Sequence, residues 1–336
     1  MKFPIEKYKY FEHIFSLNQK EMKKEMYNKL TKYYPKSKIH QTNEYIYAVG
    51  SIPIALVAHL DTVWEDAPPQ FILFDSFKNV MWAPDGLGAD DRAGCLAILE
   101  ILKYGLRPHV ILTTDEEVGG LGANALAAKP CPFRDLRYMI ELDRRGKNDC
   151  VFYDCESKPF MEYVETFGFK TAIGSFSDIS MLCGSWQVCG VNLSIGYYNE
   201  HTHKEVLFLN SMYNTIARVI KMLSVKNIPK YKWEGLSYIP IDEDFSWIKY
   251  GYGYGYGFPY QVSCKKCHKT LDSQEAVPVD NEYGGLSYYC FECLQKEVSY
   301  CPRCGMPFEN KEGIRSQKIC YKCIKEDQDD SDIYAF

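Results

Sequence analysis

Apolar residues recur at two different spacings along this chain, and the two spacings alternate. Short runs rich in β-branched residues predict strands at 54–58, 71–74, 110–114, 138–142 and 191–198. Runs with apolar residues at helical spacing predict helices at 92–104, 121–128 and 209–223. Because strands that alternate with helices form layered sheets, we expect an α/β fold with a mostly parallel mixed sheet flanked by helices.

The pattern changes near both ends of the chain. Residues 5–33 are rich in Lys, Glu, Tyr, Leu and Met at helical spacing and precede Pro35, which predicts a helix or a pair of helices. Residues 250–257 alternate Tyr and Gly, which favours a linker, with an edge strand as the alternative. The final residues are acidic and are expected to be disordered. We therefore predict a first domain at 1–249 with its core at 45–225, a linker at 250–259, a cysteine-rich module at 260–325 and a tail at 326–336.

Composition places the chain among ordinary globular proteins. It has 336 residues, of which 46% are hydrophobic and 25% charged, with a formal net charge of −5. The negative charge argues against a nucleic-acid partner, which a basic surface would favour. The apolar run 52–58 is far shorter than the roughly 18 residues of a membrane span, and the N-terminus lacks the apolar segment of a signal peptide. A cytoplasmic location without membrane association is the expectation.

The cysteines indicate metal rather than disulfides. Eight of the fourteen cysteines form four Cys-x-x-Cys pairs within the last third of the chain. Eight thiolates suit two tetrahedral zinc ions with four sulfur ligands each, as in zinc-ribbon modules. We prefer sequential pairing of the motifs, with a cross-braced arrangement as the alternative. The predicted ligands are Cys264, Cys267, Cys290 and Cys293 for one ion and Cys301, Cys304, Cys320 and Cys323 for the other.

Metal-type ligands also follow the predicted strands of the first domain. In open α/β sheets the binding crevice lies beyond the carboxyl ends of the strands. Two imidazoles and three carboxylates placed there suit two divalent ions, with one carboxylate free to bridge them. The five ligands would come from among His59, Asp61, Asp90, Asp115, Glu116, Glu117, Asp143 and His201.

The order of these motifs resembles that of the co-catalytic di-zinc exopeptidase clan. The segments are AHLDTV, GLGADDRAG, TTDEEVGGLGA, ELD, FSDIS and the His201-Thr202-x-x-Glu205 stretch, and the resemblance covers residues 50–225. The clan includes bacterial aminopeptidases, peptidase T, glutamate carboxypeptidase and aminoacylases. Only residues 144–200 lie between the last acidic ligand and the final histidine, too few to hold a separate lid domain beside the core. The chain is therefore most similar to the lidless aminopeptidase branch.

The resemblance implies a role for each of these residues. Asp61 would orient His59, Glu116 would be the general base, and Asp178 would have a supporting role. It also implies a cis peptide bond between Asp90 and Asp91. The implied ligands are His59 and Asp143 for one zinc ion and Glu117 and His201 for the other, with Asp90 bridging the two.

The expected activity is metal-dependent hydrolysis of an amide bond. We predict a zinc metallopeptidase, an aminopeptidase or small-peptide exopeptidase that uses a metal-bridging water, with Co²⁺ or Mn²⁺ able to replace the catalytic Zn²⁺. One alternative is an aminoacylase that acts on N-acyl amino acids. The other is a retired enzyme that binds a protein partner through the zinc module. Arg144 and Arg145 are either a clamp for a substrate carboxylate or, more often for such pairs, solvated.

Overall fold

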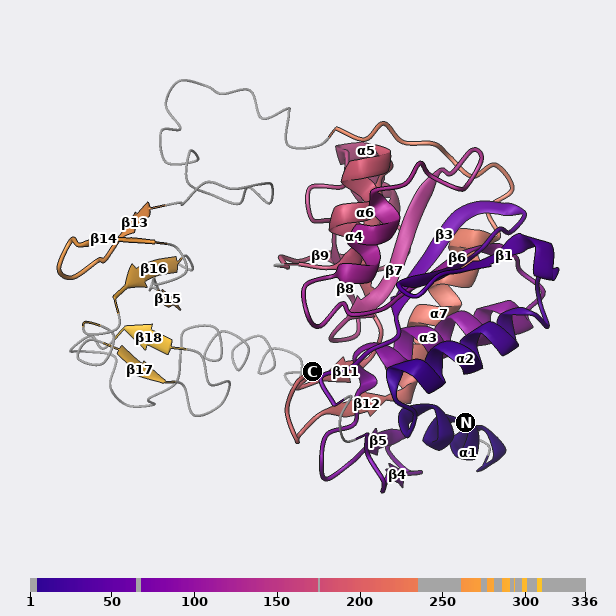
Figure 1. Cartoon of the computed structure of the whole chain (residues 1–336), viewed down its shortest axis with the longest axis horizontal. Coiled ribbons are helices and arrows are strands. Elements are labelled where there is room, and N and C mark those ends of the chain that lie inside the picture. The colour runs from indigo at the N-terminus through magenta and orange to yellow at the C-terminus, as the bar shows by residue number, and fades with distance from the viewer. Residues whose placement is uncertain are drawn as a thin grey trace, which may run out of the picture. The chain divides into compact units, whose positions relative to one another are not determined.

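The computed structural model describes residues 5–64, 68–174, 176–234, 261–272, 277–280, 286–290, 293, 298–300 and 307–309. The chain divides into two compact units, Met1–Ile241 and Asp242–Phe336 (Figure 1). The predicted linker at 250–259 and acidic tail at 326–336 lie outside the described residues, so the predicted domain boundaries stay predictions. Within the described part of the chain, no helix is long and apolar enough to cross a membrane.

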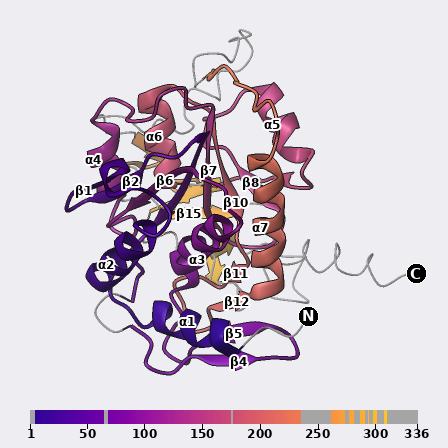
Figure 2. The same cartoon turned by 90° about the vertical axis from the view of Figure 1, so that its right-hand side faces the viewer.

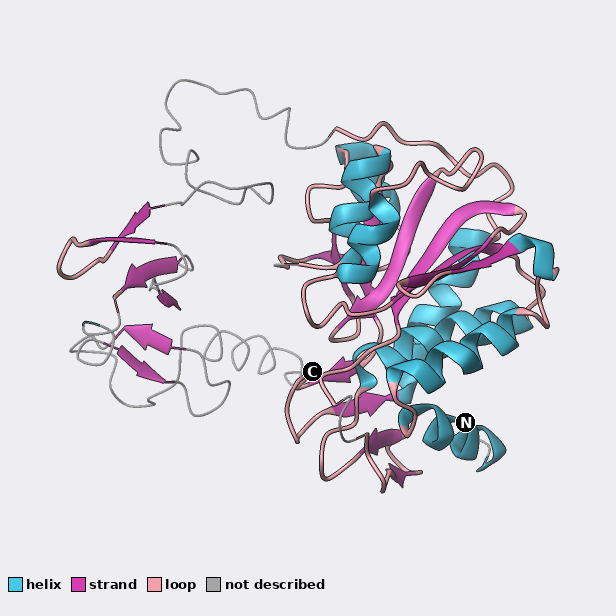
Figure 3. Ribbon diagram, viewed as in Figure 1, coloured by secondary structure: helices cyan, strands magenta, loops and turns pink. Residues whose placement is uncertain are grey.

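An eight-stranded mixed sheet forms the centre of the first unit (Figure 3). The strand order is β1-β2-β6-β3-β7-β10-β8-β9, and the central strands β6, β3, β7 and β10 pair in parallel. The predicted fold class is thereby confirmed. The bounds are β1 Ile39–Gln41, β2 Tyr45–Ala48, β3 Ile52–His59, β6 Pro108–Thr113, β7 Tyr138–Arg144, β8 Asp149–Val151, β9 Lys170–Thr171 and β10 Gly190–Ser194.

Helices cover both faces of this sheet, and each face has its own apolar core. Helices α4 and α6 bury residues such as Leu126 and Ile179 against one face. The other face packs against α1, α2, α3, α5 and α7 through residues such as Met26, Leu99 and Met212. In Figure 2, α4 and α6 lie on the opposite side of the sheet from α5 and α7. The bounds are α1 Ile5–Phe15, α2 Gln19–Leu30, α3 Ala89–Lys103, α4 Leu121–Ala127, α5 Lys158–Glu165, α6 Asp178–Trp186 and α7 Leu209–Leu223, with a short 3-10 helix, η1, at Lys36–Lys38.

The N-terminal segment is a pair of helices, one of the two forms predicted for it. Asn18 begins α2 by accepting a hydrogen bond from the Glu21 amide, and the Glu21 side chain accepts from the Asn18 amide in return. This reciprocal capping satisfies amides that have no partner inside the helix. Met22, Met26 and Leu30 then bury one side of α2.

The predicted strand at 191–198 is in fact two strands. Its first half is β10, which pairs with β7, and its second half is β11 (Tyr197–Tyr198) in a separate sheet of order β11-β12-β5-β4. Gly196 lies between them at a φ of +102°, a conformation that side chains disfavour, and a Cβ atom there would be 2.8 Å from the Phe208 carbonyl oxygen. The predicted strand at 71–74 also belongs to this sheet. The bounds are β4 Leu73–Asp75, β5 Val80–Trp82 and β12 Val206–Phe208.

The described residues of the second unit form two small sheets. Strands β13 (Gln261–Ser263) and β14 (Thr270–Asp272) pair antiparallel. A four-stranded sheet has the order β16-β15-β18-β17. Its bounds are β15 Val277–Asp280, β16 Leu286–Tyr289, β17 Val298–Tyr300 and β18 Pro307–Glu309.

Candidate metal centre

His59 is the last residue of β3, and its buried imidazole faces two carboxylates. Its Nε2 atom lies 3.1 Å from Asp90 Oδ1 and 3.6 Å from Asp143 Oδ1. Asp143 lies within β7, the parallel neighbour of β3, so it is not beyond the strand end as the apolar pattern indicated. Tyr197 donates hydrogen bonds to Asp143 Oδ1, at 3.1 Å, and to the Asp143 carbonyl, at 3.0 Å. These three side chains, His59, Asp90 and Asp143, form one candidate ligand group.

The second candidate group shares Asp90 with the first. His201 Nε2 lies 3.2 Å from Asp90 Oδ2 and 3.0 Å from Glu117 Oε2. Each oxygen of the Asp90 carboxylate therefore contacts a different imidazole, one from each group. This is the arrangement that a bridging carboxylate requires.

Asp61 links the ends of β3 and β6. Its Oδ2 atom accepts a hydrogen bond of 2.9 Å from the Glu117 amide. Its Oδ1 atom lies 3.2 Å from His59 Nδ1, although the two atoms are not aligned as an ordinary hydrogen bond. Asp61 thus lies close to the Nδ1 side of His59, as predicted, but makes no regular hydrogen bond with it.

Glu116 lies beside the same cluster. One ligand-type atom from each of His59, Glu116 and Glu117 lies within 4.8 Å of the other two. Burial, together with the carboxylates of Asp178, Asp90 and Glu117, raises the pKa of Glu116 to about 8. A carboxyl group with such surroundings holds a proton more readily than an exposed glutamate does.

Two acidic residues without an assigned role hold the segment that carries Asp90. Glu205 is buried, and its carboxylate accepts hydrogen bonds from the amides of Gly88, at 2.6 Å, and Asp90, at 3.0 Å. Asp91 accepts from the amides of His59, at 3.2 Å, and Gly94, at 2.9 Å. Glu205 was visible in the motif that follows His201, but only the folded chain shows what it contacts. The Asp90–Asp91 peptide bond is cis, as the resemblance implied.

Two more carboxylates, those of Asp178 and Glu141, are fully buried in the first unit. Thr113 donates a hydrogen bond to Asp178, and Ser177 donates one to Glu141. Burial raises the pKa of Asp178 to about 6. Asp178 thus contacts the last residue of β6, and its supporting role stays a prediction. Glu141 was missed because an apolar strand pattern does not reveal a buried acid.

The two arginines that follow Asp143 form polar contacts with other residues of the first unit. Arg145 Nη1 lies 3.0 Å from Glu200 Oε1, and Arg144 Nη2 donates to the Ile173 carbonyl at 3.2 Å. Both arginines thus have partners within the protein, which differs from the solvated state that is more common for such pairs.

The cluster as a whole fits bound cations. Burial opposes protonation of His59, but Asp143, Asp61 and Asp90 outweigh burial and raise the pKa of His59. So many carboxylates around two imidazoles create a buried excess of negative charge, which is costly unless cations neutralise it. Imidazole and carboxylate donors suit borderline divalent ions such as zinc. The residues present therefore fit the two ions implied by the resemblance.

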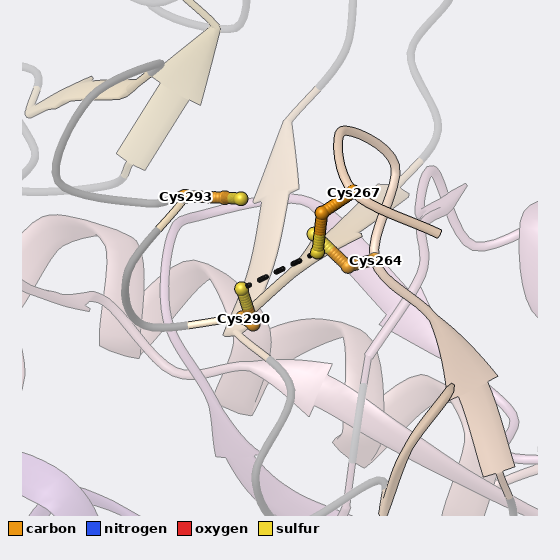
Figure 4. A group of neighbouring side chains, drawn as sticks. All are labelled: Cys264, Cys267, Cys290 and Cys293. Atoms are coloured by element: carbon orange, nitrogen blue, oxygen red, sulfur yellow. Dashed lines mark hydrogen bonds between the residues drawn. The ribbon is translucent and has the colours of Figure 1, made fainter. Parts of the chain in front are cut away.

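Four cysteines of the second unit meet in one place (Figure 4). The sulfur atoms of Cys264, Cys267, Cys290 and Cys293 all lie within 4.8 Å of one another, and those of Cys267 and Cys290 are 3.8 Å apart. These are the two motifs that sequential pairing joins. The other four predicted thiolate ligands, Cys301, Cys304, Cys320 and Cys323, lie outside the described residues.

Comparison with known protein families supports a metal-dependent peptidase in the first unit. Residues 45–172 match peptidase family M28. This match confirms the resemblance to zinc exopeptidases and identifies the first unit as a metal-dependent peptidase domain. No curated protein matches the chain.

Several solved aminopeptidase structures are similar to the chain at low sequence identity. Aminopeptidase PepT from Bacillus cereus is 14% identical, covers 63% of this chain and 95% of its own, and gives a TM-score of 0.48. The TET1 peptidase of Pyrococcus horikoshii is 16% identical over 64% of this chain and 98% of its own, with a TM-score of 0.46. An aminopeptidase from Desulfurococcus kamchatkensis is 13% identical over 66% of this chain and 95% of its own, with a TM-score of 0.47.

Proposed function

Starting from the match to peptidase family M28, we propose that this chain is an aminopeptidase or small-peptide exopeptidase that works with two zinc ions. The observation that carries the proposal is the position of Asp90. Its two carboxylate oxygens contact the imidazoles of His59 and His201 separately, at 3.1 and 3.2 Å. A carboxylate shared in this way is what a pair of co-catalytic ions needs between them.

The two groups divide the ligands between two ions. His59 and Asp143 would hold one ion, Glu117 and His201 the other, and Asp90 both. When bound, two such ions polarise the scissile carbonyl group and lower the pKa of the attacking water. Asp61 and Glu205 would keep the ligand segments in place through the backbone amides of Glu117 and Asp90.

Glu116 would move the proton. Its carboxylate lies beside the ligands and would take a proton from the attacking water. It would then deliver that proton to the nitrogen of the leaving amine as the amide bond breaks.

The segment between Asp143 and His201 is consistent with a small-peptide substrate and with the aminopeptidases that have no lid domain. Its described residues form β8, α5, β9, α6, β10 and β11, all of which belong to the first unit. Without an inserted domain, selection of the substrate would depend on residues of the α/β unit itself. Hydrolysis of N-acyl amino acids would use the same ligands, so substrate profiling must separate the two activities.

We further propose that the four meeting cysteines hold a structural zinc ion. Four sulfur atoms within 4.8 Å of one another match the donor number of a closed tetrahedral site. Cys301, Cys304, Cys320 and Cys323 would hold a second ion. A small metal-dependent module of this kind gains much of its folding free energy from the metal.

The test is a substrate profile of the purified full chain. Peptides with free N-termini, N-blocked peptides and N-acyl amino acids are offered in parallel, with Glu116→Gln as the inactive control. We expect cleavage of the unblocked peptides and loss of cleavage in the control. Hydrolysis restricted to N-acyl amino acids would instead identify a deacylase, and no hydrolysis by the zinc-loaded chain would overturn the proposal.

A further inference from the structure

The two N-terminal helices lie before the segment that matches peptidase family M28, yet the junction between them bonds to residues next to the candidate ligands. Residues 45–172 make up that match, whereas α1 and α2 end at Leu30. The contacts come from Leu17 and Gln19, at the junction between the two helices. One contact reaches the residue before Glu116 and Glu117, and the other reaches Arg92, two positions after Asp90.

The first contact is a pair of hydrogen bonds between Gln19 and Asp115. The Gln19 side-chain amide donates to Asp115 Oδ1 at 2.9 Å. Its carbonyl oxygen accepts from the Asp115 backbone amide, also at 2.9 Å. An amide side chain is suited to this position because it offers one donor and one acceptor side by side.

Asp115 is the second residue after the end of β6 and directly precedes Glu116. Its φ is +57°, a conformation that residues other than glycine adopt rarely and only where their surroundings hold them. The next two residues are Glu116 and Glu117, the proposed base and a proposed ligand. A contact that fixes Asp115 therefore helps to set the direction of both glutamates.

The second contact is made by Arg92, which is buried and follows the Asp90–Asp91 pair. Its Nη2 atom donates to the Leu17 carbonyl at 2.8 Å, and its Nη1 atom donates to the Leu60 carbonyl. Leu60 directly follows His59. Arg92 thus links the helix junction to Leu60, beside His59, while Gln19 of the same junction bonds to Asp115, before Glu116.

We propose that Gln19 is a positioning residue for the metal centre, acting through Asp115 on Glu116 and Glu117. The proposal rests on the proposed function, since it assigns those glutamates to base and ligand. What it adds is that the N-terminal helices hold the segment Asp115–Glu117 in place. Gln19 is held for this task because α2 is capped by Asn18 and anchored by Met22.

The experiment uses the full chain and exchanges the amide and carboxylate groups between positions 19 and 115. Gln19→Glu keeps the acceptor but places a carboxylate against that of Asp115, so the pair repels. Adding Asp115→Asn places a side-chain donor opposite the new carboxylate, which rebuilds the side-chain bond with its donor reversed, while the backbone amide of residue 115 still donates to residue 19. Gln19→Ala removes the amide without adding charge. Lys20→Ala is the matched control, because Lys20 is the adjacent, exposed residue of α2.

Two quantities are measured for each variant. For Gln19→Glu we expect kcat to fall about tenfold or more with KM changed less than about twofold, because the reacting groups are displaced and the substrate is still bound. We also expect zinc to pass about tenfold faster to a chromogenic chelator. Gln19→Ala should show both effects more weakly, and Lys20→Ala neither. The double variant should recover most of both losses.

The outcomes separate this proposal from the proposed function. If the wild-type chain hydrolyses no peptide, the proposed function fails, and the rates of zinc release still decide the role of Gln19. Equal kcat and equal zinc release in Gln19→Ala and Lys20→Ala would overturn the positioning role. A Gln19→Glu loss that Asp115→Asn does not repair would overturn it too, since the loss would then arise elsewhere.

Discussion

The backbone amide of Glu117 donates a 2.9 Å hydrogen bond to the carboxylate of Asp61. This bond joins the segment that follows β3 to the segment that follows β6, so one acidic side chain holds two adjacent parts of the site. With the Glu117 backbone held, its side chain reaches His201 while Glu116 remains beside His59. Consecutive residues in the chain can therefore carry different tasks.

The first prediction separates those tasks. Glu116→Gln should retain both catalytic metals yet lose activity by several orders of magnitude, because the amide cannot accept the proton. Glu117→Ala should lose one metal, because it removes a ligand. Metal content by elemental analysis and kcat on the best peptide check both. Equal metal loss in the two variants would contradict this assignment.

The second prediction concerns Glu205, whose carboxylate accepts from the amides of Gly88 and Asp90. Glu205→Gln replaces one acceptor oxygen by an NH₂ group that faces a backbone donor, which leaves a buried amide without a partner. We expect about 10- to 100-fold weaker retention of the catalytic metals, the range typical of groups that orient ligands. Competition with a chelator measures this, and Lys204→Ala, an exposed neighbour, is the control. Unchanged metal retention in Glu205→Gln would refute the role.

The third prediction is a pH dependence of stability that arises far from the metals. His109 is buried, its Nδ1 atom accepts a 3.0 Å hydrogen bond from the Gly50 amide, and burial lowers its pKa to about 4. Because folding favours the neutral ring, this contribution to the free energy of unfolding is complete above the unfolded pKa of about 6.5 and is lost as pH falls toward 4. His109→Asn, which keeps an acceptor at the position of Nδ1, should lose less stability over that range. Urea unfolding at several pH values compares them, and parallel curves would disprove the assignment.

The fourth prediction concerns the division of the chain. A chain that ends near Lys249 should keep all five N and O ligands and hydrolyse a small unhindered peptide, because each of those residues lies in the first unit. A fragment that begins near Gly257 should fold only with zinc, since metal binding would supply its folding free energy. Circular dichroism with and without chelator tests the fragment. A truncated chain that binds both catalytic metals but hydrolyses nothing would show that the cysteine-rich module completes the site.

The zinc content of the full chain provides a quantitative check on the same division. Five N and O ligands for two ions and eight thiolates for two more predict about four zinc ions per chain, two of which exchange more readily. Elemental analysis that finds only two ions, both lost with residues 260–336, would contradict the catalytic site.

Local sequence was sufficient for those features that depend on spacing along the chain. Helix α7 begins and ends where the apolar spacing predicts, because its buried face repeats with the period of a helix. The ligand residues were recognisable for a similar reason. Parallel strands end at one edge of a sheet, so polar residues directly after apolar runs converge there.

Other features depend on which segments meet after folding, and these only the tertiary structure decided. The run at 191–198 reads as one strand, but the Gly196 conformation sends its halves to different sheets. Nothing in the chain near Gln19 indicates that its amide pairs with Asp115, 96 positions later. The physical reason is that a hydrogen bond needs two groups in register in space, and the pattern of one segment carries no information about the partner that another segment brings to it.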